Sequence, residues 1–277
     1  MTDQLGSPGP SWLEIIVPAR NEQARLPSGL DALCARAAAL PPGVSVIVVD
    51  SGSTDRTAEI AARWPQEPVP VRLIQSGRRG KGAAVRAGLL ASQAPLVGFC
   101  DADMATDLFA LDEVIERLRT GHPVVIGSRA HPASVVRVRH SRVRKGGAAV
   151  FRWVARYVVP GVGDTQCGFK FFDGALARHV ALDLRATGFA FDIELLGRCR
   201  QLGAEVLEIP VNWRDVPGST FSIWRHSVEA FAEVAAIRLA LRSESVVAVT
   251  AKDSVPSLPQ GSVAGIPVAG IAAVSEP

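Results

Sequence analysis

At 277 residues the chain can bury a large core, and its length suits one α/β domain with elaborations. Hydrophobic residues make up 48% and charged residues 21%, which fits a soluble globular protein, and the formal net charge of +3 is only mildly basic. No run of about 18 apolar residues occurs, so no transmembrane helix is predicted, and the four cysteines form no C-x-x-C pair, so neither a zinc site nor a disulfide framework is indicated. We expect a cytoplasmic protein with reduced thiols that meets a membrane only peripherally, at its inner face.

Apolar runs alternate with amphipathic stretches through the first half of the chain. The predicted strands cover residues 12–17, 44–49, 71–74, 96–100 and 124–126. The predicted helices cover residues 27–37, 83–91 and 107–119, and a further helix follows Ser53 or Thr54, either of which can cap it.

The second half is less regular, and residues 12–242 are expected to form a single domain. Its predicted elements are a basic amphipathic helix at 142–159, an aromatic strand after the polar turn 163–168, a helix opened by residues 189–194, a strand at 206–211 and a helix at 221–241. Residues 1–11 carry no secretion signal and are expected to be flexible, and the Ser-, Val-, Ala-, Gly- and Pro-rich tail 243–277 is expected to be disordered.

The regular alternation predicts an α/β fold with a doubly wound, mainly parallel sheet and helices on both faces. In that architecture ligands bind at the carboxyl ends of the strands. The polar residues that follow successive strands are Arg20, Glu22, Asp50, Asp55, Lys81, Asp101, Asp103 and Arg129. Unrelated surface residues would not fall repeatedly at the same end of successive strands, so we expect one shared site.

Two segments at these strand ends indicate phosphate chemistry. Asp101 and Asp103 stand one residue apart and can share one divalent cation. Gly80 and Gly82 flank Lys81 at the start of a helix, where glycines let backbone amides approach an anion. The Walker spacing is absent, so this segment is a candidate phosphate loop and not a P-loop.

A basic block without any Asp or Glu runs from Arg117 to Gly163. Such a block can attract phosphate, nucleic acid or an anionic membrane surface. Nucleic acid is the weakest of these hypotheses, because no reading motif or aromatic stacking array accompanies the block. The basic helix 142–159 and the apolar face of 221–241 either lie on a bilayer or pack on the sheet or on a second subunit, which leaves a homo-oligomer open.

The motifs together resemble the GT-A glycosyltransferases of family 2. The matching segments of the first half are Pro18 to Glu22, Asp50 to Ser53, Gly80 to Gly82, Asp101 to Asp103 and Gly127 to Arg129. Those of the second half resemble the dolichyl-phosphate β-glucosyltransferase branch, and they are Asp164 to Lys170, Ala190 to Leu196, Val211 to Trp213 and Gly218 with Ser219.

The resemblance implies an inverting transfer of glucose from UDP-glucose to a polyprenyl phosphate, with Mg²⁺ or Mn²⁺ held by Asp101 and Asp103. The positions that it assigns to the nucleotide sugar are Pro18, Arg20, Glu22, Asp50, Gly52, Lys81, Asp101, Ala102 and Asp103. Arg129 and Arg144 would face the acceptor phosphate. Asp164, Gln166 and Asp192 would line the sugar pocket, with Asp192 and Asp103 as the catalytic carboxylates.

The chemistry of the acceptor separates the competing hypotheses. A phosphate monoester, with its second pKa of about 6, is already an anionic nucleophile at neutral pH, so no base is required. A soluble hydroxyl acceptor would need a base, for which Asp192 or Glu194 is the candidate unless both merely stabilise a helix N-terminus. A non-catalytic nucleotide-sugar-binding protein is a third hypothesis, which the intact pair of carboxylates disfavours.

Two departures from the family pattern leave the donor open between UDP-glucose and GDP-mannose. Many relatives carry a second Asp where this chain has Ser51, and many carry an aromatic residue where Arg20 stands.

Overall fold

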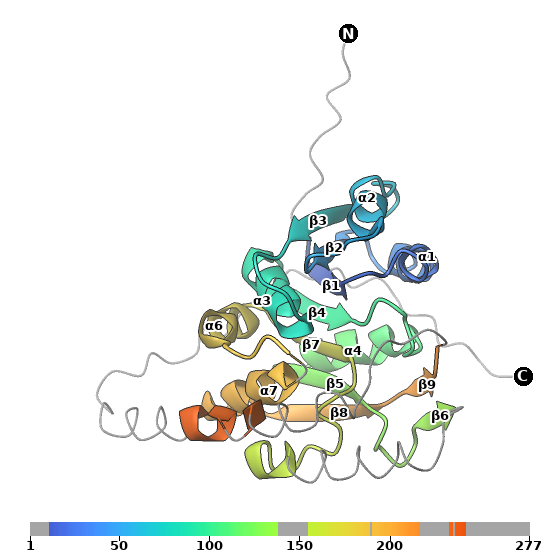
Figure 1. Cartoon of the computed structure of the whole chain (residues 1–277). Coiled ribbons are helices and arrows are strands. Elements are labelled where there is room, and N and C mark those ends of the chain that lie inside the picture. The colour runs from blue at the N-terminus through green and yellow to red at the C-terminus, as the bar shows by residue number, and fades with distance from the viewer. Residues whose placement is uncertain (1–10, 138–154, 189, 217–232, 235, 242–277) are drawn as a thin grey trace, which may run out of the picture.

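The computed structural model describes residues 11–137, 155–188, 190–216, 233–234 and 236–241. A seven-stranded sheet lies at the centre of the molecule, in the order β3-β2-β1-β4-β7-β5-β8 (Figure 1). Its strands are β1 (Leu13–Ala19), β2 (Val44–Asp50), β3 (Val71–Gln75), β4 (Leu96–Cys100), β5 (Val124–Ser128), β7 (Phe169–Asp173) and β8 (Val206–Pro210). Neighbouring strands are parallel except that β7 is antiparallel to both β4 and β5.

Helices cover both faces of this sheet and bury two hydrophobic cores. One face carries α1 (Leu26–Ala38), α2 (Thr57–Ala62) and α4 (Ala110–Arg119), and the other carries α3 (Lys81–Ala91), α6 (Gly174–Asp183) and α7 (Phe191–Gln201). Within β1, Leu13 and Ile15 join the first core while Ile16 joins the second, because successive side chains of a strand point to opposite faces. The central strands are therefore apolar on both faces, and the predicted α/β architecture is confirmed.

The place of β7 is the main feature that the sequence analysis did not foresee. Its aromatic sequence predicts a strand, yet the strand is inserted between β4 and β5, which are consecutive strands in the chain. A Cβ at Gly98 of β4 would lie 2.0 Å from the ring of Phe171, so only glycine lets β7 approach so closely. Because β7 starts beside the end of β4, residue 168 lies next to the residue that follows β4.

Three predicted helix starts differ from the structure. The α2 helix begins at Thr57 and no side chain caps it, so capping by Ser53 or Thr54 is wrong; the Ser53 hydroxyl bonds to Asp50 instead. The α3 helix begins at Lys81, two residues before the predicted start, and α4 begins at Ala110, after a turn in which the Phe109 amide donates to Asp107.

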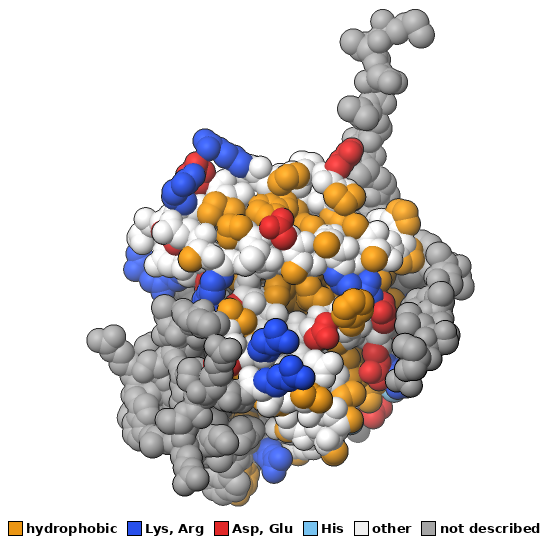
Figure 2. Space-filling view, turned by 90° about the vertical axis from the view of Figure 1, so that its right-hand side faces the viewer, with side chains coloured by type: hydrophobic (Ala, Val, Ile, Leu, Met, Phe, Trp, Pro, Cys, Tyr) orange, Lys and Arg blue, Asp and Glu red, His pale blue; other side chains and the backbone are white. Residues whose placement is uncertain are grey.

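A second, two-stranded sheet pairs β6 (Val135–Arg137) with β9 (Asn212–Arg214). Thr106 makes an isolated bridge to Trp213, which ties this small sheet to the segment that follows Asp103. The face turned to the viewer in Figure 2 mixes basic, acidic and hydrophobic side chains. Phe109 is one of the exposed hydrophobic residues of the molecule, and the centroid of its ring lies 5.4 Å from the Arg36 guanidinium.

Parts of several predicted segments lie outside the described residues. Residues 155–158, 233–234 and 236–241 are helical, as expected, but the remainder of the helices predicted at 142–159 and 221–241, most of the 1–11 segment and the 243–277 tail are not described. Where the structure does describe the chain, every helix is too short or too polar to cross a bilayer. The four cysteines are free, as predicted.

Candidate functional site

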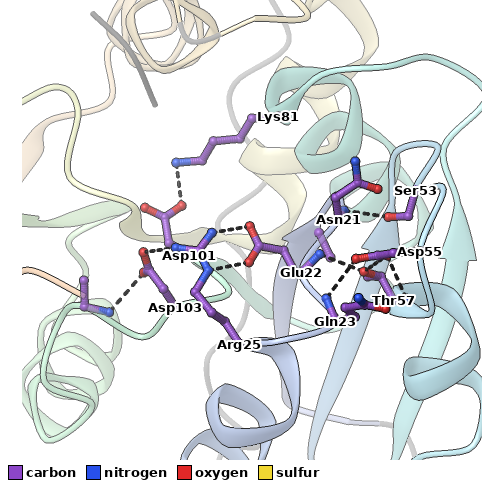
Figure 3. A network of polar contacts seen from close by, with 12 residues as sticks. Asn21, Glu22, Gln23, Arg25, Ser53, Asp55, Thr57, Lys81, Asp101 and Asp103 are labelled. Carbon is purple, nitrogen blue, oxygen red and sulfur yellow. Dashed lines mark hydrogen bonds and ion pairs between the residues drawn. The ribbon is translucent and has the colours of Figure 1, made fainter. Parts of the chain in front are cut away.

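Parallel strands deliver polar residues to one edge of the central sheet. Asp50 is the last residue of β2, Asp101 directly follows β4, and Arg129 directly follows β5. Figure 3 shows the middle of this edge, where residues 21–25, which follow β1, face the turn that holds Asp101 and Asp103. The structure thus brings the predicted polar residues to a common edge, although Arg20 is exposed and Pro18 is only partly buried.

The turn at 101–103 is fixed by backbone contacts. The Asp101 amide donates to the Gly168 carbonyl over 2.9 Å, and the Met104 amide donates back to the Asp101 carbonyl over 3.0 Å. A Cβ at Gly168 would lie 1.9 Å from the Asp101 carboxylate, and one at Gly29 would lie 2.3 Å from the Ala102 carbonyl. Close packing by two glycines therefore holds both carboxylates at the surface of the sheet edge.

Cationic side chains of the protein pair with these carboxylates. The Lys81 Nζ lies 2.6 Å from Asp101 Oδ1, and an Arg25 nitrogen lies 3.4 Å from Asp103 Oδ2 (Figure 3). Arg25 also donates to both carboxylate oxygens of Glu22, over 2.6 and 2.7 Å. Burial, and then the charge of Asp101, raise the pKa of Asp103, and burial raises the pKa of Glu22 in spite of Arg25.

The donor set fits a hard divalent cation. Glu22, Asp101 and Asp103 contribute three carboxylates against the two positive charges of Arg25 and Lys81, so the cluster carries a formal excess of one negative charge. Within the described residues no group of three or more His, Cys, Asp or Glu side chains is arranged to hold a metal ion. Asp101 and Asp103 are the two carboxylates that the family resemblance assigns to a cation, and Mg²⁺ commonly completes its shell with water and phosphate oxygens.

The loops after β1 and β2 are joined by hydrogen bonds beside this cluster. The backbone amide of Asn21 donates to the Ser53 hydroxyl over 2.9 Å, and the backbone amide of Glu22 donates to the Thr57 hydroxyl over 2.7 Å. Asn21 adopts a φ of 54° and Gly52 a φ of 82°, so both loops turn through left-handed backbone at the same level. The Asp50 carboxylate accepts a hydrogen bond from the Ser53 backbone amide over 3.2 Å, and this fixes the loop that the family resemblance assigns to the nucleoside.

The glycines around Lys81 serve close packing, and one amide of the predicted phosphate cradle is already engaged. The Gly82 amide donates to the Thr187 carbonyl over 2.9 Å, so it is not available to an anion. A Cβ at Gly80 would lie 2.1 Å from the same carbonyl, and Gly80 has a φ of 118°. The segment therefore presents the Lys81 side chain to the site.

A buried ion pair lies behind Lys81. The Lys170 Nζ, with a side chain fully removed from solvent, lies 2.7 Å from Asp192 Oδ1 and also donates to the Cys167 carbonyl. Burial raises the pKa of Asp192, while the charges of Lys170 and Lys81 oppose the shift. Asp192 therefore sits within the electrostatic reach of Lys81 and Asp101, but Lys170 already holds it.

Glu194, the other candidate base, has a structural role. One of its oxygens accepts the amides of Arg185 and Ala186 over 3.0 and 2.7 Å, and the other accepts from Arg198 over 2.9 Å. A carboxylate with all these partners and almost no exposure is poorly placed to take a proton from a substrate, so the contacts favour the structural alternative for Glu194.

Arg129 is held in a fixed orientation. Asp164, which is buried, accepts from the Arg129 backbone amide over 3.0 Å and from two guanidinium nitrogens over 2.7 and 2.9 Å. Burial would raise the pKa of Asp164, but the hydrogen bonds and charge of Arg129 lower it to about 2. Glu208 accepts the Gly163 and Asp164 amides, and the Arg129 guanidinium lies 5.6 Å from the centroid of the Trp213 ring.

Two of the three residues predicted to line the sugar pocket, Asp164 and Asp192, are already held by basic side chains. Asp164 is occupied by Arg129 and therefore positions that arginine, and the Gln166 amide donates to Asp164 over 3.1 Å. Arg144 lies outside the described residues. Arg25 and Lys170, which sequence reasoning missed, stand in direct contact with predicted site residues. Lys170 could have been identified, because a lysine within a buried aromatic strand requires an anionic partner.

Comparisons with known proteins agree on one family. Residues 14–181 match the family described as glycosyl transferase family 2. The chain is 34% identical over 229 residues to a dolichyl-phosphate β-glucosyltransferase of Trichomonas vaginalis, which covers 78% of this chain and 68% of that protein. It is 32% identical over 243 residues to the dolichyl-phosphate β-glucosyltransferase of Dictyostelium discoideum, covering 82% and 74% respectively.

Solved structures share the fold at lower identity. Glucosyl-3-phosphoglycerate synthase from Mycobacterium tuberculosis, in complex with uridine diphosphate, superposes with a TM-score of 0.62 at 23% identity, covering 84% of this chain and 80% of that one. Staphylococcus aureus TarS superposes with a TM-score of 0.54 at 18% identity, covering 83% and 64%. Both likenesses bear on the fold alone.

Proposed function

The chain belongs to glycosyl transferase family 2, and from this premise we propose that it transfers glucose, with inversion, from UDP-glucose to a polyprenyl phosphate. The observation that carries the proposal is the pair of carboxylates at the end of β4, Asp101 and Asp103, in a cluster with a net negative charge. The curated relatives named as dolichyl-phosphate β-glucosyltransferases supply the sugar and the class of acceptor.

The donor would bind across the ends of β1, β2 and β4. The loop after β2, fixed by the bond between Asp50 and Ser53, lies on the nucleoside side, and Asp101 with Asp103 lies on the diphosphate side. A bound Mg²⁺ or Mn²⁺ would stabilise the negative charge that builds on the leaving diphosphate. Uridine diphosphate and Mn²⁺ occupy a complex of the mycobacterial synthase, a protein of the same fold, which supports a uridine donor and a divalent metal for this chain.

The acceptor phosphate would approach Arg129. Asp164 occupies two nitrogens of this guanidinium and Trp213 covers one of its faces, yet about a third of the side chain remains exposed to solvent. A phosphate monoester attacks as an anion, so this route requires no base, in agreement with the engagement of Glu194 by structural partners. Because the acceptor is a lipid, the enzyme would work at a membrane surface on the cytoplasmic side.

Transfer to a soluble hydroxyl is the second candidate, and one observation favours it. Asp192 is buried within the electrostatic reach of Lys81, and burial raises its pKa, which is the direction that favours a general base. Its bond to Lys170 counts against this role, since a base must be free to accept the proton of the attacking group.

Radiolabelled donor distinguishes the candidates. The purified protein is incubated with Mg²⁺, labelled UDP-glucose or GDP-mannose, and a short polyprenyl phosphate, and label is counted in the organic phase. Label from UDP-glucose supports the proposal. Label that stays aqueous, together with UDP release on addition of hydroxyl acceptors, overturns the lipid acceptor in favour of the second candidate.

An isosteric variant tests the carboxylates in the same assay. Asp103→Asn should lower kcat/KM at least about a hundredfold, because it removes a charged oxygen from the cation without a change of shape. Asp31→Asn, which changes an exposed carboxylate of α1, is the matched control and should behave as the parent protein. Unchanged activity of Asp103→Asn at limiting metal would remove this residue from the site.

A further inference from the structure

The amine of Lys81 stands where a cation would contact Asp101. Its Nζ lies 2.6 Å from Asp101 Oδ1, and the lysine side chain is only 16% exposed. Asp103 also has a cationic partner, but a weaker one, because Arg25 lies 3.4 Å away and already donates two hydrogen bonds to Glu22. The strongest competitor of a metal ion at this pair of carboxylates is thus a side chain of the protein itself.

The charges of the cluster decide what can bind alone. Three carboxylates and two cations leave one negative charge, so a divalent ion by itself would turn the cluster positive while Lys81 still contacts Asp101. A nucleotide diphosphate by itself would meet two carboxylates. Bound together, a divalent cation and a diphosphate that carries one negative charge on each phosphoryl group leave the net charge of the cluster unchanged, and they also give the displaced ammonium a new anion.

The surroundings of Lys81 restrict how it can move. Gly80 and Gly82 are packed against the backbone of residues 186–187, which fixes the main chain at this point. The Nζ lies 5.8 Å from the ring centroids of both Phe99 and Phe191. An ammonium that leaves Asp101 therefore moves only by rotation of its side chain, and it remains at the same edge of the sheet.

We propose that Lys81 is an exchangeable counter-ion: it neutralises Asp101 while the site is free, and it transfers to the donor diphosphate when a divalent cation takes the carboxylate. This inference rests on the metal site of the proposed function. It makes the binding of metal and of nucleotide mutually dependent, with Lys81 as the group that couples them.

Binding of Mn²⁺ to the full-length protein tests the exchange without any turnover. Free Mn²⁺ is measured by electron paramagnetic resonance, with and without UDP, for the parent protein, Lys81→Met and Lys81→Arg. Arg86→Met is the matched control, because it removes a positive charge from the same helix at a side chain that donates to the Leu182 carbonyl of α6 over 3.1 Å. Circular dichroism confirms that each variant is folded.

The parent protein should bind Mn²⁺ weakly alone and about tenfold more tightly with UDP, a coupling of ordinary size. Lys81→Met should bind Mn²⁺ alone about tenfold more tightly than the parent and should lose most of the enhancement by UDP. Lys81→Arg and Arg86→Met should keep the pattern of the parent protein.

The opposite results are equally defined. If Lys81→Met binds Mn²⁺ alone no more tightly than the parent, Lys81 does not compete with the metal and the exchange is wrong. If UDP does not strengthen Mn²⁺ binding by the parent, the coupling is wrong. Mn²⁺ binding as expected, in a protein that labels no lipid, retains the exchange and overturns only the proposed acceptor.

Discussion

Replacement of Asp164 by asparagine tests the ion pair that orients Arg129. The Asp164 side chain is 3% exposed and accepts two guanidinium bonds, over 2.7 and 2.9 Å, together with the Arg129 amide. Asparagine keeps the shape and one carbonyl oxygen, so the substitution removes charge and one acceptor without opening a cavity. The arginine is left with its charge and no carboxylate.

The magnitude follows from the pKa of Asp164. Folding lowers it from an ordinary 3.8 to about 2, which corresponds to roughly 2.5 kcal/mol at about 1.4 kcal/mol per pKa unit. Breaking a buried pair by removal of one partner costs about 3–5 kcal/mol, and water reaches the partly exposed Arg129, which places the value at the lower end. We expect Asp164→Asn to lower the free energy of unfolding by about 2–3 kcal/mol at pH 7.

Urea denaturation of parent and variant across a pH series is the assay. Because folding lowers the pKa of Asp164, its stabilising contribution is complete above pH about 4 and is lost as the pH falls towards about 2. The difference between the two proteins should therefore be constant from pH 7 to 5 and shrink below pH about 4. Glu113→Gln, at an exposed pair with Arg117, is the control and should change stability by less than about 1 kcal/mol.

Two results would refute this reasoning. A difference below about 0.5 kcal/mol at pH 7 would show that the pair only offsets its own desolvation. A difference that does not depend on pH between 5 and 3 would show that lost packing, and not the charge of Asp164, causes the destabilisation.

Two further substitutions probe the contacts behind the site. Gly168→Ala should displace the Asp101 carboxylate, which a Cβ would approach to 1.9 Å, and should weaken Mn²⁺ binding in the presence of UDP about tenfold or more. Gly77→Ala, where a Cβ would lie in open space, is the control and should not change this affinity. Equal affinities of Gly168→Ala and the parent protein would show that the carboxylate is free to shift. Lys170→Met should lower the free energy of unfolding by about 3–5 kcal/mol in urea, because it leaves Asp192 buried without its cation, and a loss below about 1 kcal/mol would mean that Asp192 is protonated in the parent protein.

The first half of the fold could be predicted from sequence because its signals are local. Most strands from β1 to β5 are mainly apolar and end at or just before a polar residue, and amphipathic or glycine-led stretches separate them. The order of the strands is not local. Nothing in the sequence Phe169–Asp173 states that the strand pairs with β4 on one side and β5 on the other, since pairing depends on which edges remain open when the strand arrives.

The candidate site divides in the same way. Residues that directly follow strands, such as Asp101 and Arg129, could be placed because parallel strands end at one edge. Their pairings could not: Asp164 was expected in the sugar pocket and not against Arg129, because it lies in a loop 35 residues away in sequence, and Arg25 lies in a turn without a motif. The same limitation affected Gly80 and Gly82: a glycine-rich turn fits either an anion or a close backbone, and only the position of Thr187 decided between them.

The insertion of β7 also sets the order in which the molecule can assemble as it is synthesised. Until Phe169–Asp173 leaves the ribosome, β4 has one open edge and β5 lacks both of its neighbours, since its other partner, β8, comes later still. Residues up to the end of β4 can pair early, through contacts that are closer in sequence. The hydrogen bond from Asp101 to Gly168 forms only after this late strand docks. A nascent chain therefore cannot fix its carboxylate turn until β7 joins the two halves of the sheet.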